Sequence, residues 1–490
     1  MLEAAEKGKL AKADYEAVLP GLRTDLVNAQ YELRSAGRPV LVTIAGDDRP
    51  GATALYNVLH EWLDARYLAS HAWAPPDPGE ELYPPFWRYW RALPPKGALG
   101  VWLGGWLQSR LRLRLEDALD DGELARSLDQ YRRFEVLLAA EGFVLLKLWI
   151  HLSNKQHAKR LAKASRGKGE WRLDENDWRI GDDPEAWTPL VEEVLARTQS
   201  DAAPWLVVSG ANERHRDVTV GRAVLAALGS ACEEKARAPS APLPLPSRAP
   251  NPLDAVDLTA ELPYEIYKKR LAKRQRELFG LVNRAEAAGL RPVLVFQGWD
   301  AAGKGGAIRR ITHAIDARDY RVVRIAAPSE EERRHPWLWR FWRHLTPAGR
   351  MVIFDRSWYG RVLVERVEGF ASEADWRRAY DEIVDFEAQL AGAGSLVMKF
   401  FLHIDADEQI RRFRAREHTP YKKYKITEDD YRNREKRPAY MEAAAEMFAR
   451  TGTETAPWHL VPANDKRWAR VAVLDAICAT LRRALPGKAG

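Results

Sequence analysis

The chain has 490 residues, of which 46% are hydrophobic and 30% are charged, so it can bury two or three cores and is not a fully disordered protein. Its two cysteines, Cys232 and Cys478, exclude a disulfide scaffold. The formal net charge is +7, but residues 1–250 carry 33 basic and 35 acidic side chains, so all the excess positive charge lies in residues 251–490. A basic surface attracts anions such as nucleic acid, acidic lipid or phosphate chains.

The N-terminal segment lacks the apolar core of a signal peptide, and no apolar run is long enough to span a bilayer. We therefore expect a soluble cytoplasmic protein without membrane contact. No dedicated nucleic-acid-binding motif is present.

Residues 1–232 contain several short apolar segments. They include RPVLVTIAGDDRPG at 38–51, FVLLKLWIHL at 143–152 and APWLVVSGANERH at 203–215. Residues 233–254 are rich in proline and alanine and have no periodic apolar face. Prolines disfavour a helix there, so we interpret this stretch as a semi-extended linker.

Residues 255–490 repeat the pattern of the first half. The matching segments are RPVLVFQGWDAAG at 291–303, SLVMKFFLHI at 395–404 and APWHLVPANDKRW at 456–468. The segment FWRYWRALPPKG at 86–97 likewise matches LWRFWRHLTPAG at 338–349. A repeat of about half the chain length indicates that one domain was duplicated and fused.

Five apolar runs mark the strands of the second copy, at 292–297, 321–326, 351–354, 396–403 and 458–462. Apolar runs that alternate with longer amphipathic segments are typical of a parallel sheet covered on both faces. The sequence therefore predicts two tandem P-loop-kinase-like domains, each a three-layer α/β/α fold with a parallel sheet. Ligands of such domains bind at the carboxyl ends of the strands.

The segment GWDAAGKGG, from Gly298 to Gly306, has the spacing of a phosphate-binding loop between a strand and a helix. Gly298, Gly303 and the following Gly305 and Gly306 allow backbone N–H groups to surround phosphate oxygens, and Lys304 adds a positive charge. The Ser or Thr that usually follows the lysine and ligates magnesium is Gly305 here. Asp300, inside the loop, is our candidate for the missing Mg²⁺ ligand. The alternative is that Asp300 only caps a helix or turn.

A second candidate carboxylate, Asp355, ends the apolar run of 351–354. A strand-end carboxylate beside a phosphate loop can bind magnesium directly or through water. Arg356 and Arg361 follow it, and arginine suits phosphate oxygens and developing negative charge. The alternative is an ordinary strand-end aspartate with surface arginines.

The stretch 411–440 is dense in arginine and lysine. We interpret it as a basic lid that closes over phosphates and excludes water. Its candidate phosphate-binding residues are Arg412, Arg416, Lys422, Lys423 and Lys425. For any one of them, a solvated surface charge is the alternative. We also expect a helix at 335–345, with its tryptophans in the core rather than stacking on bases.

These segments resemble the polyphosphate kinase family 2. The resemblance rests on GWDAAGKGG, on the stretch from His335 to Val367, on the lid RAREHTPYKKYKITEDDY and on APWHLVPANDKRWARV, which occur in the family's order over nearly all of 255–485. The fused arrangement resembles the two-domain subgroup of that family. This resemblance implies transfer of the terminal phosphoryl group of inorganic polyphosphate to AMP, giving ADP, with Mg²⁺.

The first copy lacks most of the candidate site residues. Lys304 corresponds to Ala52, Asp355 to Leu103 and Arg356 to Gly104, whereas Asp300 still corresponds to Asp48. The lid lysines are replaced in KGEWRLDENDW at 168–178. We therefore expect residues 1–232 to be a folded but inactive copy that packs against the active domain of 255–490, with a homo-oligomer left open.

The residues alone leave other functions open. Polyphosphate-dependent phosphorylation of ADP or GDP and an ATP-dependent P-loop nucleotide kinase fit the same motifs. A polyphosphate-binding module without activity is the non-enzymatic alternative, which the presence of Asp300, Lys304, Asp355 and Arg356 disfavours.

Overall fold

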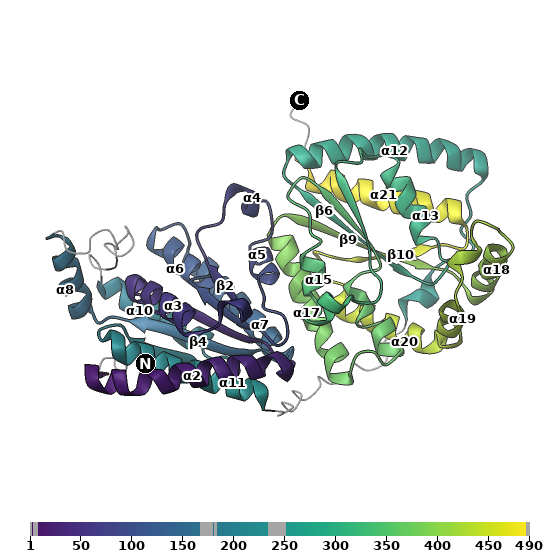
Figure 1. Cartoon of the computed structure of the whole chain (residues 1–490). Coiled ribbons are helices and arrows are strands. Elements are labelled where there is room, and N and C mark those ends of the chain that lie inside the picture. The colour runs from purple at the N-terminus through teal and green to yellow at the C-terminus, as the bar shows by residue number, and fades with distance from the viewer. Residues whose placement is uncertain (1, 3–7, 167–179, 181–183, 234–250, 487–490) are drawn as a thin grey trace. The chain divides into compact units, whose positions relative to one another are not determined.

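The computed structural model describes residues 2, 8–166, 180, 184–233 and 251–486, which form two compact units (Figure 1). Unit 1 is built mainly from residues 8–76 and 88–233 and also includes residues 328–340. Unit 2 contains residues 77–87, 251–327 and 341–486. Each unit therefore includes one short segment from the other half of the chain, and experiments on either unit are best made on the full chain.

Unit 1 holds a five-stranded sheet in which all neighbouring strands are parallel, in the order β2-β3-β1-β4-β5. The strands are β1 (Val40–Gly46), β2 (Leu68–Ala72), β3 (Leu99–Leu103), β4 (Val144–His151) and β5 (Trp205–Ser209). One face is covered by α2 (Lys12–Ala36), α3 (Arg49–Trp62) and α11 (Glu213–Cys232), and the other by α6 (Trp106–Leu115), α7 (Asp121–Ala140) and α10 (Pro184–Thr198). Helix α8 (Asn154–Ala164) follows β4. Leu148 and Ile150 belong to one hydrophobic cluster and Trp149 to the other, because successive side chains of a strand point to opposite faces.

Unit 2 repeats this architecture with the parallel order β7-β8-β6-β9-β10. The strands are β6 (Arg291–Gly298), β7 (Tyr320–Arg324), β8 (Met351–Asp355), β9 (Ser395–His403) and β10 (Trp458–Pro462). Helices α12 (Tyr264–Ala287), α13 (Lys304–Thr312) and α21 (Lys466–Ala484) pack together on one face, and α17 (Glu373–Gly392) and α20 (Arg437–Thr451) lie on the other (Figure 1). Helices α18 (Ala406–Glu417) and α19 (Glu428–Glu435) follow β9. The predicted fold class, two tandem α/β/α domains with parallel sheets, is confirmed.

The remaining elements are short. They are the helices α4 (Pro78–Glu81), α5 (Trp87–Arg91), α14 (Glu330–Arg333), α15 (Trp339–Trp342) and α16 (Val364–Val367) and the 3₁₀ turns η1 (Ala65–Tyr67), η3 (Pro252–Ala255), η4 (Trp358–Gly360) and η5 (Lys423–Lys425). The helix expected over 335–345 is thus limited to the four residues of α15. Pro336 accounts for the absence of His335 from the helix, because a proline disfavours helical backbone in the residue before it. Trp337, Trp339 and Trp342 are buried, as expected for core residues.

Two sequence-based expectations fall on residues outside the described ranges. Most of the linker of 233–254, namely 234–250, lies there, as does the first-copy segment 168–178. Among the described residues, no helix is both long and apolar enough to cross a bilayer.

A buried lysine–glutamate pair lies inside unit 2. Lys399 Nζ, on β9, donates to Glu387 Oε2, on α17, at 2.8 Å and to the carbonyl oxygen of Thr451 at 2.6 Å. The hydroxyl of Tyr359 donates to Glu387 Oε1 at 2.6 Å. Burial raises the pKa of Glu387 and lowers that of Lys399, and each charge opposes the shift of the other. The pair joins the central sheet to the helix layer above it.

Unit 1 contains the same pair at equivalent positions. Lys147 Nζ, on β4, donates to Glu135 Oε2, on α7, at 2.8 Å and to the carbonyl oxygen of Thr198 at 2.6 Å. The pair is therefore present in the copy that lacks the phosphate-loop lysine. This distribution assigns it to the fold rather than to the chemistry.

Replacing one partner of this pair should destabilise unit 2. In Lys399→Met, Glu387 is left buried without its cation, which costs about 3–5 kcal/mol of the free energy of unfolding. Urea denaturation of the full chain measures this loss. Lys147→Met is the matched variant in unit 1, and Lys399→Met combined with Glu387→Leu should recover most of the stability. A loss below about 1 kcal/mol in Lys399→Met would contradict the assignment.

Candidate functional site

The carboxyl ends of β6 and β8 and the start of α13 define the candidate site. β6 pairs with both β8 and β9, so the loop that leaves its end lies at the centre of the sheet edge. This loop, residues 298–304, is named the phosphate loop here. Gly298 has a φ of 130°, and a Cβ at this position would lie 2.3 Å from the carbonyl oxygen of Leu402 on β9. Only glycine fits there.

The predicted glycines shape the start of α13. Gly303, with a left-handed φ of 113°, is the N-cap residue of the helix, so its backbone turns without steric cost. Gly305 and Gly306 lie in the first turn of α13. The N-terminus of α13 therefore borders the loop, and its partial positive charge favours an anion.

Lys304 folds back over the phosphate loop. Its Nζ donates to the carbonyl oxygens of Gly298 at 2.6 Å and Trp299 at 3.1 Å. Burial lowers the pKa of Lys304, the charges of Asp300 and Asp355 oppose this shift, and that of Arg356 adds to it. An anion in the loop would compete with these carbonyl groups for the ammonium.

Asp300 is held in its ionised form. Its carboxylate accepts hydrogen bonds from Arg356 at 3.0 Å and from Asn433 Nδ2 at 3.1 Å. Burial raises the pKa of Asp300, but the charges of Lys304 and Arg356 and these hydrogen bonds outweigh it, so the pKa is lowered. A negative charge is therefore kept inside the loop.

Asp355 and Arg356 end β8 beside the loop. Asp355 lies opposite Phe296 in the β6–β8 register, and its charge acts on Lys304. Within the part of the chain that the structure describes, the Asp355 carboxylate makes no hydrogen bond or ion pair. Arg356 adopts a left-handed φ of 64°, uncommon for a residue with a side chain, and its backbone N–H donates to Phe296 at 3.1 Å. The structure thus brings Asp300, Lys304, Asp355 and Arg356 together; their catalytic roles stay predictions.

The two carboxylates fit a magnesium ion that completes its shell elsewhere. Mg²⁺ prefers oxygen ligands and usually combines one or two carboxylates with water and substrate phosphates. No group of three or more His, Cys, Asp or Glu side chains suited to a metal occurs among the described residues. The donor set of Asp300 and Asp355 therefore matches an ion held partly by phosphate oxygens.

The other predicted phosphate-binding residues lie around this centre in different states. Arg361, half-buried, forms an ion pair with Glu365 at 3.0 Å. Arg416 is half-buried, and its charge acts on Lys304. The lysines of the lid, Lys422, Lys423 and Lys425, are exposed. Their roles in binding phosphate stay predictions.

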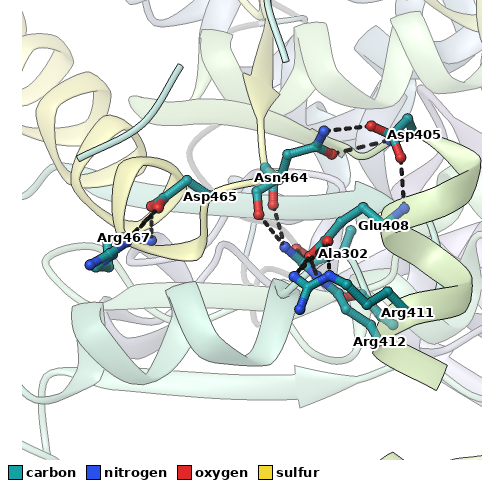
Figure 2. A network of polar contacts seen from close by, with 10 residues as sticks. Ala302, Asp405, Glu408, Arg411, Arg412, Asn464, Asp465 and Arg467 are labelled. Carbon is teal, nitrogen blue, oxygen red and sulfur yellow. Dashed lines mark hydrogen bonds and ion pairs between the residues drawn. The ribbon is translucent and has the colours of Figure 1, made fainter. Parts of the chain in front are cut away.

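Arg412 occupies a different place from the other lid residues. Its side chain is only 2% exposed and lies against backbone rather than solvent. Its guanidinium donates to the carbonyl oxygens of Ala301, Ala302, Ala463 and Asn464 (Figure 2).

Three further residues near the loop were not predicted. Asn433, on α19, binds Asp300, and Gln409 Nε2, on α18, donates to the carbonyl oxygen of Asp300 at 3.2 Å. Gln409 precedes Arg412 by one helical turn, so the two side chains share a face of α18. Once Arg412 is known to contact the loop, this spacing predicts that Gln409 lies near the loop as well. Lys466 begins α21, and its pKa is lowered to about 8 by burial and by nearby arginines, with Glu408 opposing.

The equivalent loop of unit 1 keeps its carboxylate but uses another cation. Asp48 is fully buried, caps α3 by accepting the N–H of Gly51 at 2.8 Å, and forms an ion pair with Arg160 of α8. Ala52 takes the place of the loop lysine. Gly46, like Gly298, lies too close to a neighbouring carbonyl oxygen, that of Ile150, for a Cβ.

His403 supports the phosphate loop from β9. Trp299 Nε1 donates to His403 Nδ1 at 2.8 Å, so this nitrogen carries no proton. Burial lowers the pKa of His403 to about 4, the charge of Arg437 adds to the shift, and Asp254 and Asp405 oppose it. The ring is therefore neutral near pH 7.

Comparison with known proteins identifies relatives along the whole chain. A family model described as Polyphosphate kinase 2 matches residues 9–236 and again residues 261–488. The chain is 47% identical over 484 residues to the polyphosphate:AMP phosphotransferase of Pseudomonas aeruginosa, covering 97% of this chain and 98% of that protein. It is 44% identical over 491 residues to the polyphosphate:AMP phosphotransferase of Pseudomonas syringae pv. tomato, covering 99% of each. A crystal structure described as polyphosphate kinase 2 from Pseudomonas aeruginosa PA01 matches with a TM-score of 0.89 and 45% identity over 99% of both chains.

The His403 pKa predicts a pH-dependent stability. The folded chain holds this proton more weakly than the unfolded chain, whose histidine has a pKa of 6.5, so the contribution is complete above pH 6.5 and is lost as the pH falls toward 4. In His403→Asn, the amide oxygen still accepts from Trp299 but does not titrate. Between pH 7 and about pH 4.5, wild type should therefore lose more free energy of unfolding than His403→Asn. Parallel losses in urea denaturation would contradict this prediction.

Proposed function

The chain belongs to the polyphosphate kinase 2 family, and we propose that it transfers the terminal phosphoryl group of inorganic polyphosphate to AMP, giving ADP. The observation that carries the proposal is the convergence of Asp300, Lys304 and Arg356 at the end of β6, in a chain whose full-length relatives are named polyphosphate:AMP phosphotransferases. Donor and product both contain phosphoanhydride bonds, so the reaction is close to balance and reversible.

In the proposed reaction, an oxygen of the AMP phosphate attacks the terminal phosphorus of polyphosphate, and the bond to the bridging oxygen breaks. Such a loose transition state needs placement and neutralisation of charge rather than a strong base. Lys304 and Arg356 would neutralise the oxygens of the transferred group. Both are already held at the loop, Lys304 by two carbonyl oxygens and Arg356 by Asp300.

Asp300 and Asp355 would hold Mg²⁺. When bound, the ion would offset the negative charge of the phosphate groups. The ionised state of Asp300 supports this assignment, because a metal ligand must be deprotonated. Arg356 now pairs with Asp300 and would be available to phosphate oxygens once the carboxylate has a metal partner.

The basic lid would bind the phosphate chain and exclude water. Arg416 lies within electrostatic reach of Lys304, and the exposed Lys422, Lys423 and Lys425 follow α18. Arg361 would complete the rim beyond β8. Exclusion of water matters because water competes with AMP for the phosphoryl group.

We propose that unit 1 is inactive. It lacks the loop lysine, the strand-end carboxylate and the adjacent arginine, and its remaining carboxylate, Asp48, is paired with Arg160. Its role in packing against the active domain stays a prediction. We also propose a cytoplasmic location, which suits a chain with two cysteines, Cys232 and Cys478.

The alternatives differ in donor and acceptor. Formation of ADP from AMP with long-chain polyphosphate and no ATP excludes an ATP-dependent kinase and a binding module. Comparing AMP, ADP, GMP and GDP in the same assay separates the proposed acceptor from the diphosphates. Turnover with ADP or GDP but not AMP would overturn the choice of AMP.

Lys304→Ala should lower kcat by about 100- to 1,000-fold, since it removes the cation that faces the transferred group. Initial rates of ADP formation measure the loss. Lys269→Ala is the matched control, because this lysine is exposed on α12 and does not belong to the phosphate loop. Because unit 1 is intact in Lys304→Ala, the same assay tests its inactivity. Full turnover in Lys304→Ala would refute the role of Lys304. If that turnover came from unit 1, it would also refute the inactivity of unit 1.

A further inference from the structure

Arg412 uses all of its hydrogen-bond donors inside the protein. A guanidinium has five N–H groups. In this structure Nη1 donates to Ala301 at 2.9 Å and Ala302 at 2.8 Å, and Nη2 donates to Ala463 at 2.6 Å and Asn464 at 2.8 Å. Nε donates to a fifth oxygen, on Glu408. No donor is left for a phosphate oxygen.

The partners of Arg412 connect three parts of unit 2. Ala301 and Ala302 belong to the phosphate loop, Ala463 and Asn464 follow β10, and Glu408 lies one turn earlier on α18 (Figure 2). Arg412 therefore joins the phosphate loop to the end of a neighbouring strand and to the helix from which the lid continues.

A second set of hydrogen bonds fixes the start of α18. Asp405, its N-cap residue, accepts the N–H of Glu408 at 2.7 Å and the Nδ2 of Asn464 at 2.6 Å, and its own N–H donates to Asn464 Oδ1 at 3.2 Å. Figure 2 shows this pairing beside the guanidinium. The helix is thus tied to the end of β10, and Arg412 projects from a rigid base.

The carbonyl contacts orient the backbone of the loop. The C=O and N–H groups on the two sides of a peptide unit point in opposite directions. The carbonyl groups of Ala301 and Ala302 face Arg412, so the amides of Ala302 and Gly303, which belong to the same peptide units, point away from it. Ala301 has a left-handed φ of 63°, which is costly for a residue with a Cβ and needs support from its surroundings. Two charge-assisted hydrogen bonds supply that support.

The first copy offers an internal comparison. Arg160 occupies the equivalent position on α8 and also contacts its loop, through Asp48. The arginine is thus present where the loop lysine, the strand-end aspartate and its neighbouring arginine are absent. A residue whose only task is to bind substrate phosphate would have no reason to stay in contact with that loop.

From these contacts we propose that Arg412 is a positioning residue: it holds the phosphate loop in its anion-binding shape and does not itself bind phosphate. This role replaces the direct phosphate contact predicted from the sequence. The kinetic part of its test rests on the proposed function, whereas the structural part needs no substrate.

The decisive experiment is hydrogen exchange of the loop without any substrate. The amide of Ala302 donates to the carbonyl of Trp299 at 3.0 Å and reports whether the loop is closed. In the full-length Arg412→Gln protein, peptides covering 296–306 should exchange at least about ten-fold faster than in wild type, because the carbonyl groups lose their donors. In Arg411→Gln, the matched control, exchange should be unchanged, because Arg411 is exposed and contacts Glu408.

Kinetics with polyphosphate and AMP then separate positioning from binding. Arg412→Lys should lower kcat about ten-fold or more while the KM for polyphosphate changes less than about three-fold, since one ammonium cannot satisfy four carbonyl groups. Arg416→Gln, a predicted phosphate contact, should instead raise that KM with unchanged exchange of the loop.

The proposal is overturned if Arg412→Gln leaves exchange of the loop unchanged and raises the KM for polyphosphate as Arg416→Gln does. If Arg412→Gln fails to fold, the same exchange measurement is made on Glu408→Gln. This variant weakens the contact between Glu408 and the Arg412 guanidinium but keeps the guanidinium itself. Faster loop exchange in Glu408→Gln supports the role, and unchanged exchange refutes it. If no variant and no wild-type sample turns over AMP, the exchange result still stands, so failure of the proposed function is recognised separately.

Discussion

A buried carboxylate needs a cation, and this constraint organises the phosphate loop of both units. An unpaired charge in the interior costs several kcal/mol, so the fold must bring a positive side chain to it. In unit 2, Lys304 and Arg356 serve Asp300. In unit 1, Arg160 serves Asp48.

The duplication separates what the fold needs from what the chemistry needs. Both units keep the glycine that lets the loop pass a neighbouring strand, and both keep the lysine–glutamate pair between sheet and helix. Only unit 2 keeps a lysine in the loop and an aspartate at the end of its neighbouring strand. One chain therefore contains a scaffold with the candidate phosphate-binding charges and the same scaffold without them.

The fold was predictable because its signals are local. Apolar runs marked the strands of unit 2, and the glycine spacing placed Gly298, Gly303 and Lys304 at the turn between β6 and α13. The direction of a long side chain is not a local property. Arg412 was grouped with the lid because of its charged neighbours, but packing of α18 against the loop buries it. Asn433 reaches Asp300 only through the path of the chain after α18, which no spacing in the sequence reveals.

The ion pair of Asp48 and Arg160 would make the proposed loss of activity in unit 1 difficult to reverse. Returning a lysine to position 52 would place a second cation beside a fully buried carboxylate that already has one. The guanidinium of Arg160 would first have to leave the carboxylate, and that step on its own leaves the buried charge of Asp48 unpaired. Several positions would need to change together to give unit 1 the charges of unit 2. A duplicated domain can therefore lose such charges by single substitutions but regain them only by simultaneous ones.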